Sequence, residues 1–409
     1  MSHNRHRKVA KHHLTIRLII LVIVAGAIVF SYTRALPPLY PKVATVAPPA
    51  TVSNPIVWPN SQEAAFGANG FSILAVQGVQ KQIPIASVAK LITALTILQK
   101  YPLALSQLQT PVITLTNADV AIYNQYVSEQ GSVVKVVAGE QINEYQALEA
   151  MLIPSANNMA DSLAIWAFGS LPNYATAANQ YIKSIGLTQT TIGTDASGFL
   201  PATTSTAHDL ILIGFQALNN PVIAQIVDQT QVTLPVAGVV KNYDWLLGTN
   251  GIIGIKTGNT NQAGGVFVFA ASDKIVGSTT SNIQIVGSIE GAATLQEALN
   301  DTPAFLNSIK DNFYSAPIIE SHEIVGTYKI PWGDTINAVS QNNISAPLWK
   351  GTTIRPIISL QDVYAPLNSD ASVGVVDVPG QITNTKSNIV LQQPIPAAPW
   401  WWRIIRHKL

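Results

Sequence analysis

A serine and a lysine stand three positions apart, at Ser87 and Lys90, where the apolar run 91–98 begins. Residues three apart share one face of a helix, so a helix that starts at Ala86 or Ser87 brings the lysine amine to the serine hydroxyl. A neutral amine in that position can take the hydroxyl proton and make the oxygen a nucleophile. Such a pair could therefore serve nucleophilic catalysis, although by itself it is more typical of a helix N-cap followed by a surface lysine.

The same spacing occurs a second time at Ser132 and Lys135. These two residues lie in a valine-rich stretch whose composition predicts a strand. Side chains three apart on a strand point to opposite faces, so the lysine could not reach the serine. We therefore interpret Ser132 and Lys135 as a coincidental match.

A second candidate motif, Ser155-Ala156-Asn157, lies between two helical patterns that are separated at Pro154. A short loop between helices can direct a hydroxyl and an amide into one cleft, which residues two apart on a helix cannot do. The similar triplet Ser340-Gln341-Asn342 falls far downstream, in a region of different character.

A third candidate motif is Lys256-Thr257-Gly258, which precedes the strand-like run 265–271. Gly258 has no side chain, so the backbone of a substrate could lie against the strand at this point. Lys256 offers a cation and Thr257 a hydroxyl, a combination that suits a carboxylate. Of the three motifs, this one occurs only once in the sequence.

Together and in this order, the three motifs resemble those of the penicillin-recognising acyl transferases. More specifically, the chain resembles the D-alanyl-D-alanine carboxypeptidases, the low-molecular-weight penicillin-binding proteins of peptidase family S11. The resemblance extends to the segments 194–199, 205–210, 242–247 and 254–260. The chain departs from the usual family pattern at five positions, none of which removes a catalytic functional group: Ile85, Ala89, Ala156, His208 and Asn259.

The resemblance implies an α/β (α+β) fold, with a catalytic domain like that of serine β-lactamases and penicillin-binding proteins. This domain contains an antiparallel sheet with a helical lobe and is followed by a small all-β domain. The implied substrate is a peptidoglycan stem peptide that ends in D-Ala-D-Ala, and β-lactams are the implied inhibitors. No cofactor is expected.

The roles implied for the site residues follow from acyl transfer. Ser87 attacks the peptide carbonyl, Lys90 is the candidate base, Ser155 relays a proton to the leaving amine, and Asn157 holds the substrate amide. The candidate substrate-binding residues are Lys256, Thr257, Gly258 and Asn259. The backbone N–H groups of Ser87 and Asn259 would form the oxyanion hole.

Three other functions remain as alternatives. An endopeptidase that cleaves peptidoglycan cross-links would use the same residues in a cleft of different shape. A class A β-lactamase would need a Glu-x-x-Leu-Asn loop, but Glu297-Ala298-Leu299-Asn300 is one residue short and follows the third motif. A non-catalytic wall-binding protein would be expected to have lost Ser87 or Lys90.

Composition narrows the class of protein. The chain has 409 residues, of which 47% are hydrophobic and 11% charged, so most of it should fold. A net charge of +1 argues against a nucleic-acid surface. There is no cysteine and no His-Glu-x-x-His pattern, which makes a catalytic metal an unattractive interpretation.

The N-terminal region has the charge pattern of a membrane anchor. Five basic residues precede the uncharged run 18–33, namely Arg5, Arg7, Lys8, Lys11 and Arg17. Such a flank predicts that the basic end stays in the cytoplasm and that the rest of the chain lies outside. We favour an uncleaved signal anchor over a cleaved signal peptide, and hence a single-pass cell-membrane protein with an extracytoplasmic catalytic domain.

Composition shifts along the chain predict five segments: a basic tail and anchor (1–36), a proline-rich linker (37–56), the catalytic domain (57–312), an all-β domain (313–394) and a Trp/Arg tail (395–409). Tryptophans beside cations suit a lipid–water boundary, with packing on the β domain as the alternative. We expect His208 in the first turn of a helix that is capped by Thr206.

Overall fold

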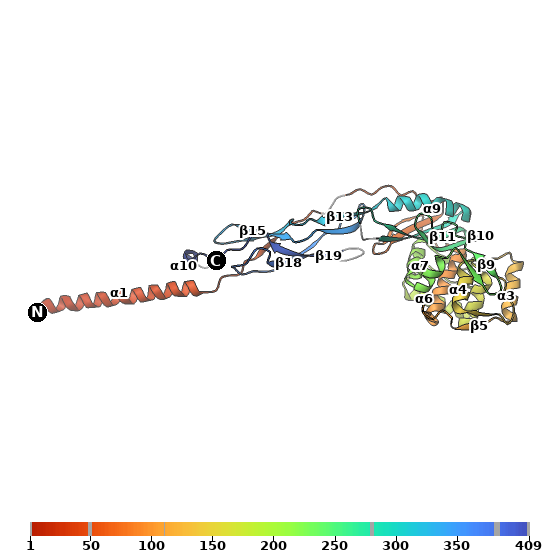
Figure 1. The fold of residues 1–409 in the computed structure, drawn as a ribbon, viewed down its shortest axis with the longest axis horizontal. Coiled ribbons are helices and arrows are strands. Elements are labelled where there is room, and N and C mark those ends of the chain that lie inside the picture. Colours follow the sequence, from red (N-terminus) through yellow and green to blue (C-terminus); the bar gives the residue numbers. More distant parts are fainter. Residues whose placement is uncertain (1, 48–50, 110, 279–281, 380–384, 407–409) are drawn as a thin grey trace. The chain divides into compact units, whose positions relative to one another are not determined.

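The structure is a computed structural model of the chain, and it describes residues 2–47, 51–109, 111–278, 282–379 and 385–406, with side chains from residue 12 onward (Figure 1). Each of the five predicted segments has residues outside this described part: residue 1 of the basic tail and anchor, 48–50 of the linker, 110 and 279–281 of the catalytic domain, 380–384 of the β domain and 407–409 of the Trp/Arg tail. The chain forms two compact units. We call residues 52–314 the catalytic unit, and residues 1–51 together with 315–409 the β unit.

The catalytic unit is built on an antiparallel sheet of five strands in the order β10-β11-β12-β2-β3. Its strands come from both ends of the unit: β2 (Glu63–Ala68), β3 (Ser72–Gln77), β10 (Ile252–Thr260), β11 (Gly264–Lys274) and β12 (Asn282–Ala292). Helix α9 (Leu295–Lys310) packs against β11 and β12. The predicted sheet with an inserted helical lobe is confirmed, and β10 forms one edge of the sheet.

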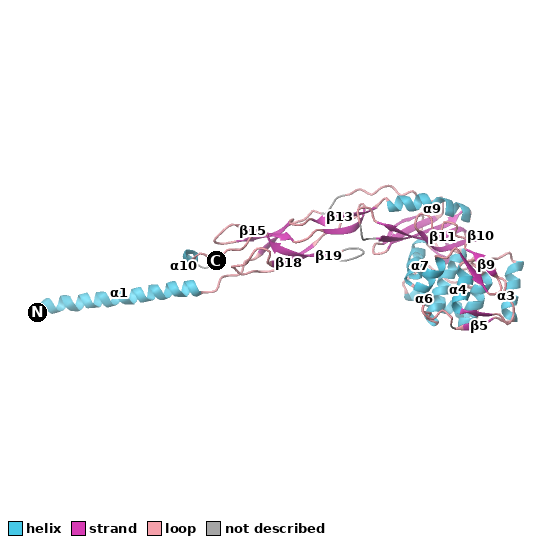
Figure 2. Cartoon of the chain, in the orientation of Figure 1, coloured by secondary structure: helices cyan, strands magenta, loops and turns pink. Residues whose placement is uncertain are grey.

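The inserted lobe is mainly helical, as Figure 2 shows. Its helices are α2 (Ala89–Lys100), α3 (Asn117–Ser128), α4 (Glu144–Leu152), α5 (Asn157–Phe168), α6 (Leu171–Ser184), α7 (Ala207–Asn219) and α8 (Pro221–Val227). Short strand pairs join β4 (Ile83–Pro84) to β7 (Thr204–Ser205), β5 (Val112–Thr114) to β6 (Gln141–Asn143), and β8 (Gln231–Leu234) to β9 (Gly238–Lys241). Helix α2 is buried on every face from residue 89 to 98, because its side chains are almost all apolar.

The β unit contains the predicted short strands. A six-stranded sheet has the order β1-β14-β15-β19-β18-β17. Its strands are β1 (Pro41–Val43), β14 (Ile324–Lys329), β15 (Thr335–Ser340), β17 (Ile357–Leu360), β18 (Ser372–Val378) and β19 (Thr385–Leu391). Strands β13 (Phe313–Ile319) and β16 (Ile344–Trp349) form a separate pair.

Strand β1 lies inside the segment that composition predicts as a spacer. It pairs with β14, and Leu39 just before it forms a bridge with Val363 and is buried. Proline is tolerated at the first residue of an edge strand, where its missing N–H costs no ladder bond, and Pro41 occupies that place. The segment therefore differs from a free spacer over these residues.

Two helices at the chain's ends contact each other within the β unit. Helix α1 (Ser2–Thr33) includes His12–Thr33, a stretch long and apolar enough to cross a membrane. Helix α10 (Trp400–Ile405) lies beside its C-terminal end. The Arg406 guanidinium donates to the carbonyls of Ser31 and Ala35 at 3.3 and 3.1 Å, and also to that of Arg34. These bonds satisfy carbonyls that a helix C-terminus leaves without partners.

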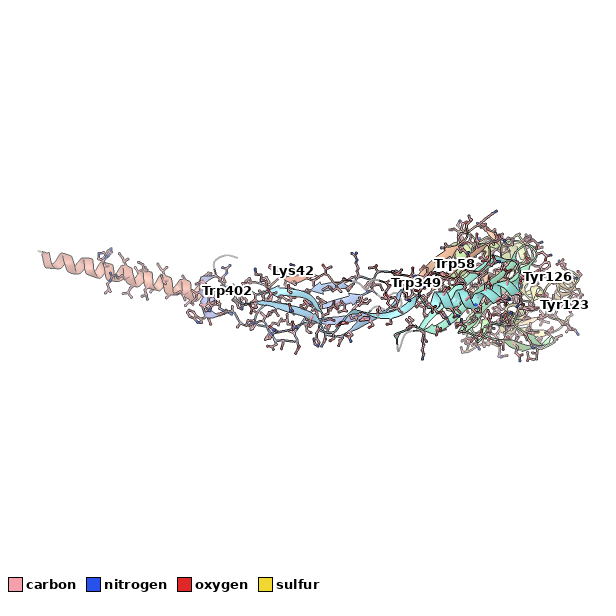
Figure 3. The ribbon with its side chains drawn as sticks, turned by 90° about the horizontal axis from the view of Figure 1, so that it is seen from above. Lys42, Trp58, Tyr123, Tyr126, Trp349 and Trp402 are labelled. Carbon is pink, nitrogen blue, oxygen red and sulfur yellow. The ribbon has the colours of Figure 1, made fainter. Side chains whose placement is uncertain are left out.

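The tryptophans of the tail divide into two kinds. Trp402 is buried, with its ring 4.6 Å from that of Trp332; Figure 3 marks Trp402. Trp400 and Trp401 remain 68% and 46% exposed. The tail thus combines packing on the β unit with an exposed aromatic pair.

Candidate active site

Ser87 lies in a single 3-10 turn, η1 (Ala86–Val88), which leads directly into α2. Lys90 occupies the first turn of α2, and its Nζ donates to Ser87 Oγ at 2.8 Å. The structure therefore brings the two residues together through the spacing seen in the sequence. Ser87 is half-buried, so its hydroxyl remains accessible to a substrate.

The Lys90 ammonium group lies in the protein interior. Besides Ser87, its Nζ contacts Asn157 Oδ1 at 2.8 Å and the Ser197 carbonyl at 3.0 Å. Burial, together with the charge of Lys256, holds the pKa of Lys90 well below its usual value, while Asp195 and Asp161 oppose this shift. A buried amine of lowered pKa is neutral for a larger fraction of the time, which is what a base needs.

The second motif links α4 to α5, as its loop prediction requires. Ser155 adopts a left-handed conformation, with φ at 60°, and Asn157 begins α5. The Asn157 N–H donates to the Ser132 carbonyl at 2.7 Å. The buried Ser155 hydroxyl makes no hydrogen bond to any of the described residues. That hydroxyl is therefore free to bond a ligand.

The strand prediction around Ser132 and Lys135 is wrong. Residues 131–137 are irregular, and Lys135 is exposed to solvent. The Asn158 side chain accepts from Val134 N at 3.1 Å and donates to Val134 O at 3.0 Å. A side-chain amide thus takes the place of a neighbouring strand.

The third motif lies on edge strand β10, against η1. A Cβ added at Gly258 would be 3.0 Å from Ser87 N and 3.1 Å from the Ile85 carbonyl. Glycine therefore lets the strand approach the turn that carries Ser87 without crowding its backbone, besides leaving room for a substrate. Asn259 is the next residue on this strand and is exposed.

Lys256 and Thr257 are both buried on β10. The Lys256 Nζ donates to the Thr257 carbonyl at 3.0 Å. Burial lowers the pKa of Lys256 to about 7, and Asp244 partly offsets this effect. A carboxylate that arrives at this amine would complete its coordination and favour its charged form.

The sequence analysis did not identify two side chains that hold the loop beside Lys90, namely Tyr126 and Asp161. Tyr126 on α3, whose place is marked in Figure 3, donates to Asp161 Oδ2 at 2.7 Å, and Asp161 Oδ1 accepts from Ala196 N at 2.9 Å. The Ser197 hydroxyl donates to Asp195 Oδ2 at 2.8 Å. The segment 194–199 was noted as part of the resemblance, whereas Asp161 and Tyr126 carry no local signal.

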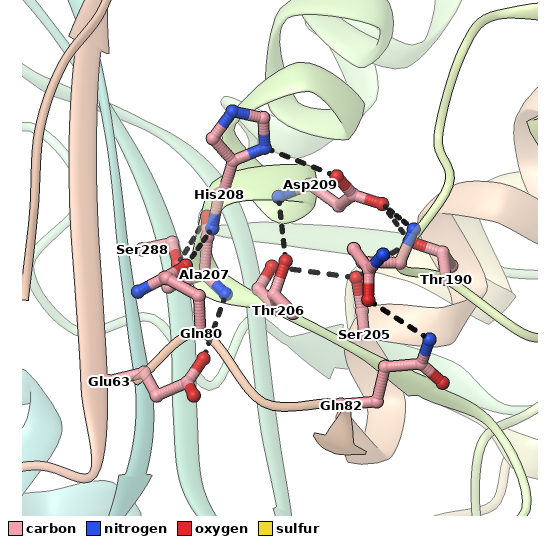
Figure 4. A network of polar contacts seen from close by, with 11 residues as sticks. Glu63, Gln80, Gln82, Thr190, Ser205, Thr206, Ala207, His208, Asp209 and Ser288 are labelled. Carbon is pink, nitrogen blue, oxygen red and sulfur yellow. Dashed lines mark hydrogen bonds and ion pairs between the residues drawn. The ribbon is translucent and has the colours of Figure 1, made fainter. Parts of the chain in front are cut away.

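His208 lies outside this cluster, as predicted. Thr206 caps α7, and its hydroxyl accepts from Asp209 N at 3.2 Å. Figure 4 shows that the His208 ring turns toward Asp209, which also accepts from Thr190. The histidine thus belongs to a structural network at the start of the helix.

Comparison with known proteins identifies a family. The family model for D-alanyl-D-alanine carboxypeptidases of peptidase family S11 matches residues 63–281, more than half of the chain. The D-alanyl-D-alanine carboxypeptidase DacA of Escherichia coli K12 is 24% identical over 352 residues, which cover 82% of this chain and 84% of DacA. DacB2 of Mycobacterium tuberculosis is 36% identical over 147 residues, covering 34% of this chain and 50% of DacB2.

Solved structures show the same fold. Penicillin-binding protein 5 of Haemophilus influenzae superposes with a TM-score of 0.58 at 18% identity and covers 84% of this chain and 99% of that one. A peptidoglycan synthesis regulatory factor of Streptococcus pneumoniae, PBP3, gives 0.59 at 19% identity, with 83% and 100% covered. With the family model, these matches show that the chain is a serine peptidase that belongs to family S11, the D-alanyl-D-alanine carboxypeptidases.

Proposed function

We propose that this enzyme removes the terminal D-alanine from peptidoglycan stem peptides through an acyl-enzyme on Ser87, and that penicillins acylate the same serine. The observation that carries the assignment is the contact at 2.8 Å between Nζ of the buried Lys90 and Oγ of the half-buried Ser87. A neutral Lys90 takes the hydroxyl proton as Ser87 attacks the carbonyl, and D-alanine leaves.

The other motif residues complete the reaction. Ser155, whose hydroxyl is buried near Lys90's partner Asn157, passes a proton to the leaving amine. Asn157 uses its Oδ1 on Lys90, which leaves its Nδ2 to donate to the substrate. The backbone N–H groups of Ser87 and Asn259 stabilise the oxyanion, one from the turn and one from the edge strand.

Recognition of the free carboxylate falls to β10. Lys256 provides the charge and Thr257 a hydroxyl, while the strand edge holds the peptide backbone. Water then hydrolyses the acyl-enzyme and releases the shortened stem peptide.

We further propose that the enzyme works outside the cytoplasm while it is attached to the cell membrane. Residues 12–33 of α1 would span the bilayer, with residues 57–312 as the catalytic domain and 313–394 as the β domain. The exposed pair Trp400 and Trp401, with Arg403 nearby, would contact the outer lipid surface.

The test combines two measurements on the full chain. Wild-type protein should be labelled covalently by a fluorescent penicillin, and mass spectrometry should show release of one D-alanine from a pentapeptide ending in D-Ala-D-Ala. Ser87→Ala should lose both activities, whereas Ser132→Ala should keep both. Labelling that survives in Ser87→Ala would refute the assignment, and cleavage of cross-linked dimers without pentapeptide trimming would identify an endopeptidase instead.

A further inference from the structure

The loop behind the catalytic lysine is held by a carboxylate that belongs to none of the three motifs. Ser197 offers its backbone carbonyl to Lys90 Nζ at 3.0 Å. The neighbouring Ala196 N–H donates to Asp161 Oδ1 at 2.9 Å. The position of the carbonyl that Lys90 meets therefore depends on a bond between this loop and α5.

Asp161 has a second connection, to a third element. Its Oδ2 accepts from the Tyr126 hydroxyl at 2.7 Å, and this hydroxyl also lies 3.3 Å from Ser197 Oγ. Tyr126 comes from α3 and packs edge-on against Phe199, at a centroid distance of 5.6 Å. One buried carboxylate thus ties α3, α5 and the 195–199 loop together.

The same helix also carries Asn157, the other partner of Lys90. Asn157 and Asp161 are four residues apart on α5, so they lie on one face of it. Asn157 Oδ1 and Ser197 O together direct the Lys90 amine toward Ser87. A shift of the loop relative to α5 would change the angle between these two acceptors.

We propose that Asp161 is a positioning residue of the acyl transfer: with Tyr126 it fixes the 195–199 loop to α5, and thereby aims Lys90 at Ser87. This proposal rests on the proposed function, since it assumes that Lys90 activates Ser87. Asp161 touches neither the substrate nor the reacting atoms.

The charges around Lys90 give a signature that packing alone would not produce. Lys90 faces Lys256 from β10, Asp195 from the loop and Asp161 from α5. Lys256 lowers the pKa of Lys90, whereas the two carboxylates raise it. Removal of the Asp161 charge should therefore let Lys90 lose its proton at lower pH.

The experiment measures the rate of acylation by a fluorescent penicillin from pH 5 to 9 in the full chain. Asp161→Ala should lower the plateau rate about tenfold, the size expected when a buried charge-assisted bond is lost. The rise of the acylation rate on the acidic side of the pH profile, which we call the acid limb, should move to lower pH by about half a unit. Asp161→Asn keeps an acceptor for Ala196 N without the charge, so it should restore much of the plateau while the limb stays shifted.

Two further variants separate positioning from general packing. Ser162→Ala alters the next residue of α5, which is also buried and whose hydroxyl has no partner among the described residues, and should leave both plateau and limb unchanged. Tyr126→Phe should lower the plateau about threefold, since Asp161 loses the bond from the tyrosine hydroxyl but keeps the one from Ala196 N. Combined with Asp161→Ala it should cost nothing more, because the two residues act as a unit.

The proposal is overturned if Asp161→Ala retains the wild-type plateau and limb, or if Ser162→Ala reproduces its losses. If Asp161→Ala does not fold, Tyr126→Phe tests the proposal in its place. Unchanged acylation in that variant also overturns the proposal. Failure of the proposed function looks different, since labelling would then survive in Ser87→Ala whatever happens at Asp161.

Discussion

The two units of the molecule differ in whether they bury charged side chains. In the part of the chain that the structure describes, every buried charged side chain lies in the catalytic unit: Glu63, Lys90, Glu140, Glu144, Glu149, Asp161, Asp195, Asp209, Asp244, Lys256 and Glu290. The buried polar side chains described in the β unit are Ser340 and Ser387. Burying a charge costs stability unless it is paired, so we infer that the catalytic unit gives up stability for reactivity.

The largest expected difference between the two units is the effect on acylation of a glycine-to-alanine substitution in each. Gly258→Ala places a Cβ 3.0 Å from Ser87 N and pushes β10 away from the serine. We expect a loss of acylation of about 100-fold, since small misplacements of reacting groups have effects of that size. The readout is the rate of fluorescent penicillin labelling.

The matched change in the β unit is Gly374→Ala, whose Cβ would lie 2.1 Å from the Ser359 carbonyl on the paired strand. This variant should be destabilised by about 1–3 kcal/mol in thermal unfolding and should still acylate at the wild-type rate. Equal losses of acylation in both variants would show that the distinction between the units is wrong.

Lys256→Ala should weaken turnover of substrates with a free terminal carboxylate by about 2 kcal/mol, because a charge-assisted contact is lost. A carboxylate-free ester should suffer less. Steady-state kinetics on the two substrates measure the difference, and equal losses on both would place Lys256 in the chemical step.

The pH dependence of the wild-type enzyme sharpens this role of Lys256. Burial lowers the pKa of Lys256 to about 7, so its charge disappears as the pH rises through that value. The kcat/KM for the carboxylate substrate should therefore fall above pH 7, relative to that for the ester. A constant ratio of the two from pH 6 to 9 would contradict the assigned contact.

Glu290→Gln probes a buried carboxyl group that serves no proposed catalytic step. Burial, with Glu63 and Asp209 nearby, raises the pKa of Glu290 well above its usual value, so the folded protein holds this proton more tightly than the unfolded chain. Stability from this group is complete below its unfolded pKa and is lost as pH rises. Glu290→Gln should thus stabilise the protein by about 1–3 kcal/mol at pH 8 and little at pH 5.

The matched control for Glu290 is Asp377→Asn in the β unit. It breaks the ion pair of Asp377 with Lys386 at 2.9 Å, in which the lysine is 62% exposed. Thermal unfolding should detect a change below about 1 kcal/mol, since exposed pairs contribute little. If stability changed more with pH in Asp377→Asn than in Glu290→Gln, the proposed difference between the two units would be wrong.

The last prediction concerns the tail, where membrane contact rather than acylation is tested. In protein that lacks residues 1–36, replacing Trp400 and Trp401 by alanine should weaken binding to anionic liposomes about tenfold, because both rings are exposed beside cations. Trp402→Ala should lower the melting temperature instead, because that ring packs on Trp332. Sedimentation with liposomes measures the first effect, and undiminished binding of the double variant would exclude this surface.

The sequence predicted what depends on local pattern. Period-two strands, the mostly apolar α2 and the spacing of Ser87 and Lys90 are local, so the sheet, the helical lobe and that contact could be predicted. Tyr126 and Asp161 are 35 residues apart in helices of ordinary composition, and only tertiary packing joins them. The strand predicted near Ser132 failed because Asn158 satisfies that backbone, and the short β1 is hidden in a proline-rich segment.

The contact between Arg406 and the end of α1 has a consequence for the order of events during synthesis. The guanidinium and the Ser31 carbonyl are 375 residues apart in sequence. A ribosome makes α1 first, and the arginine emerges only after both units have been translated. The end of α1 therefore lacks this partner until residue 406 has been made, so the β unit cannot complete its contacts before the catalytic unit has been translated.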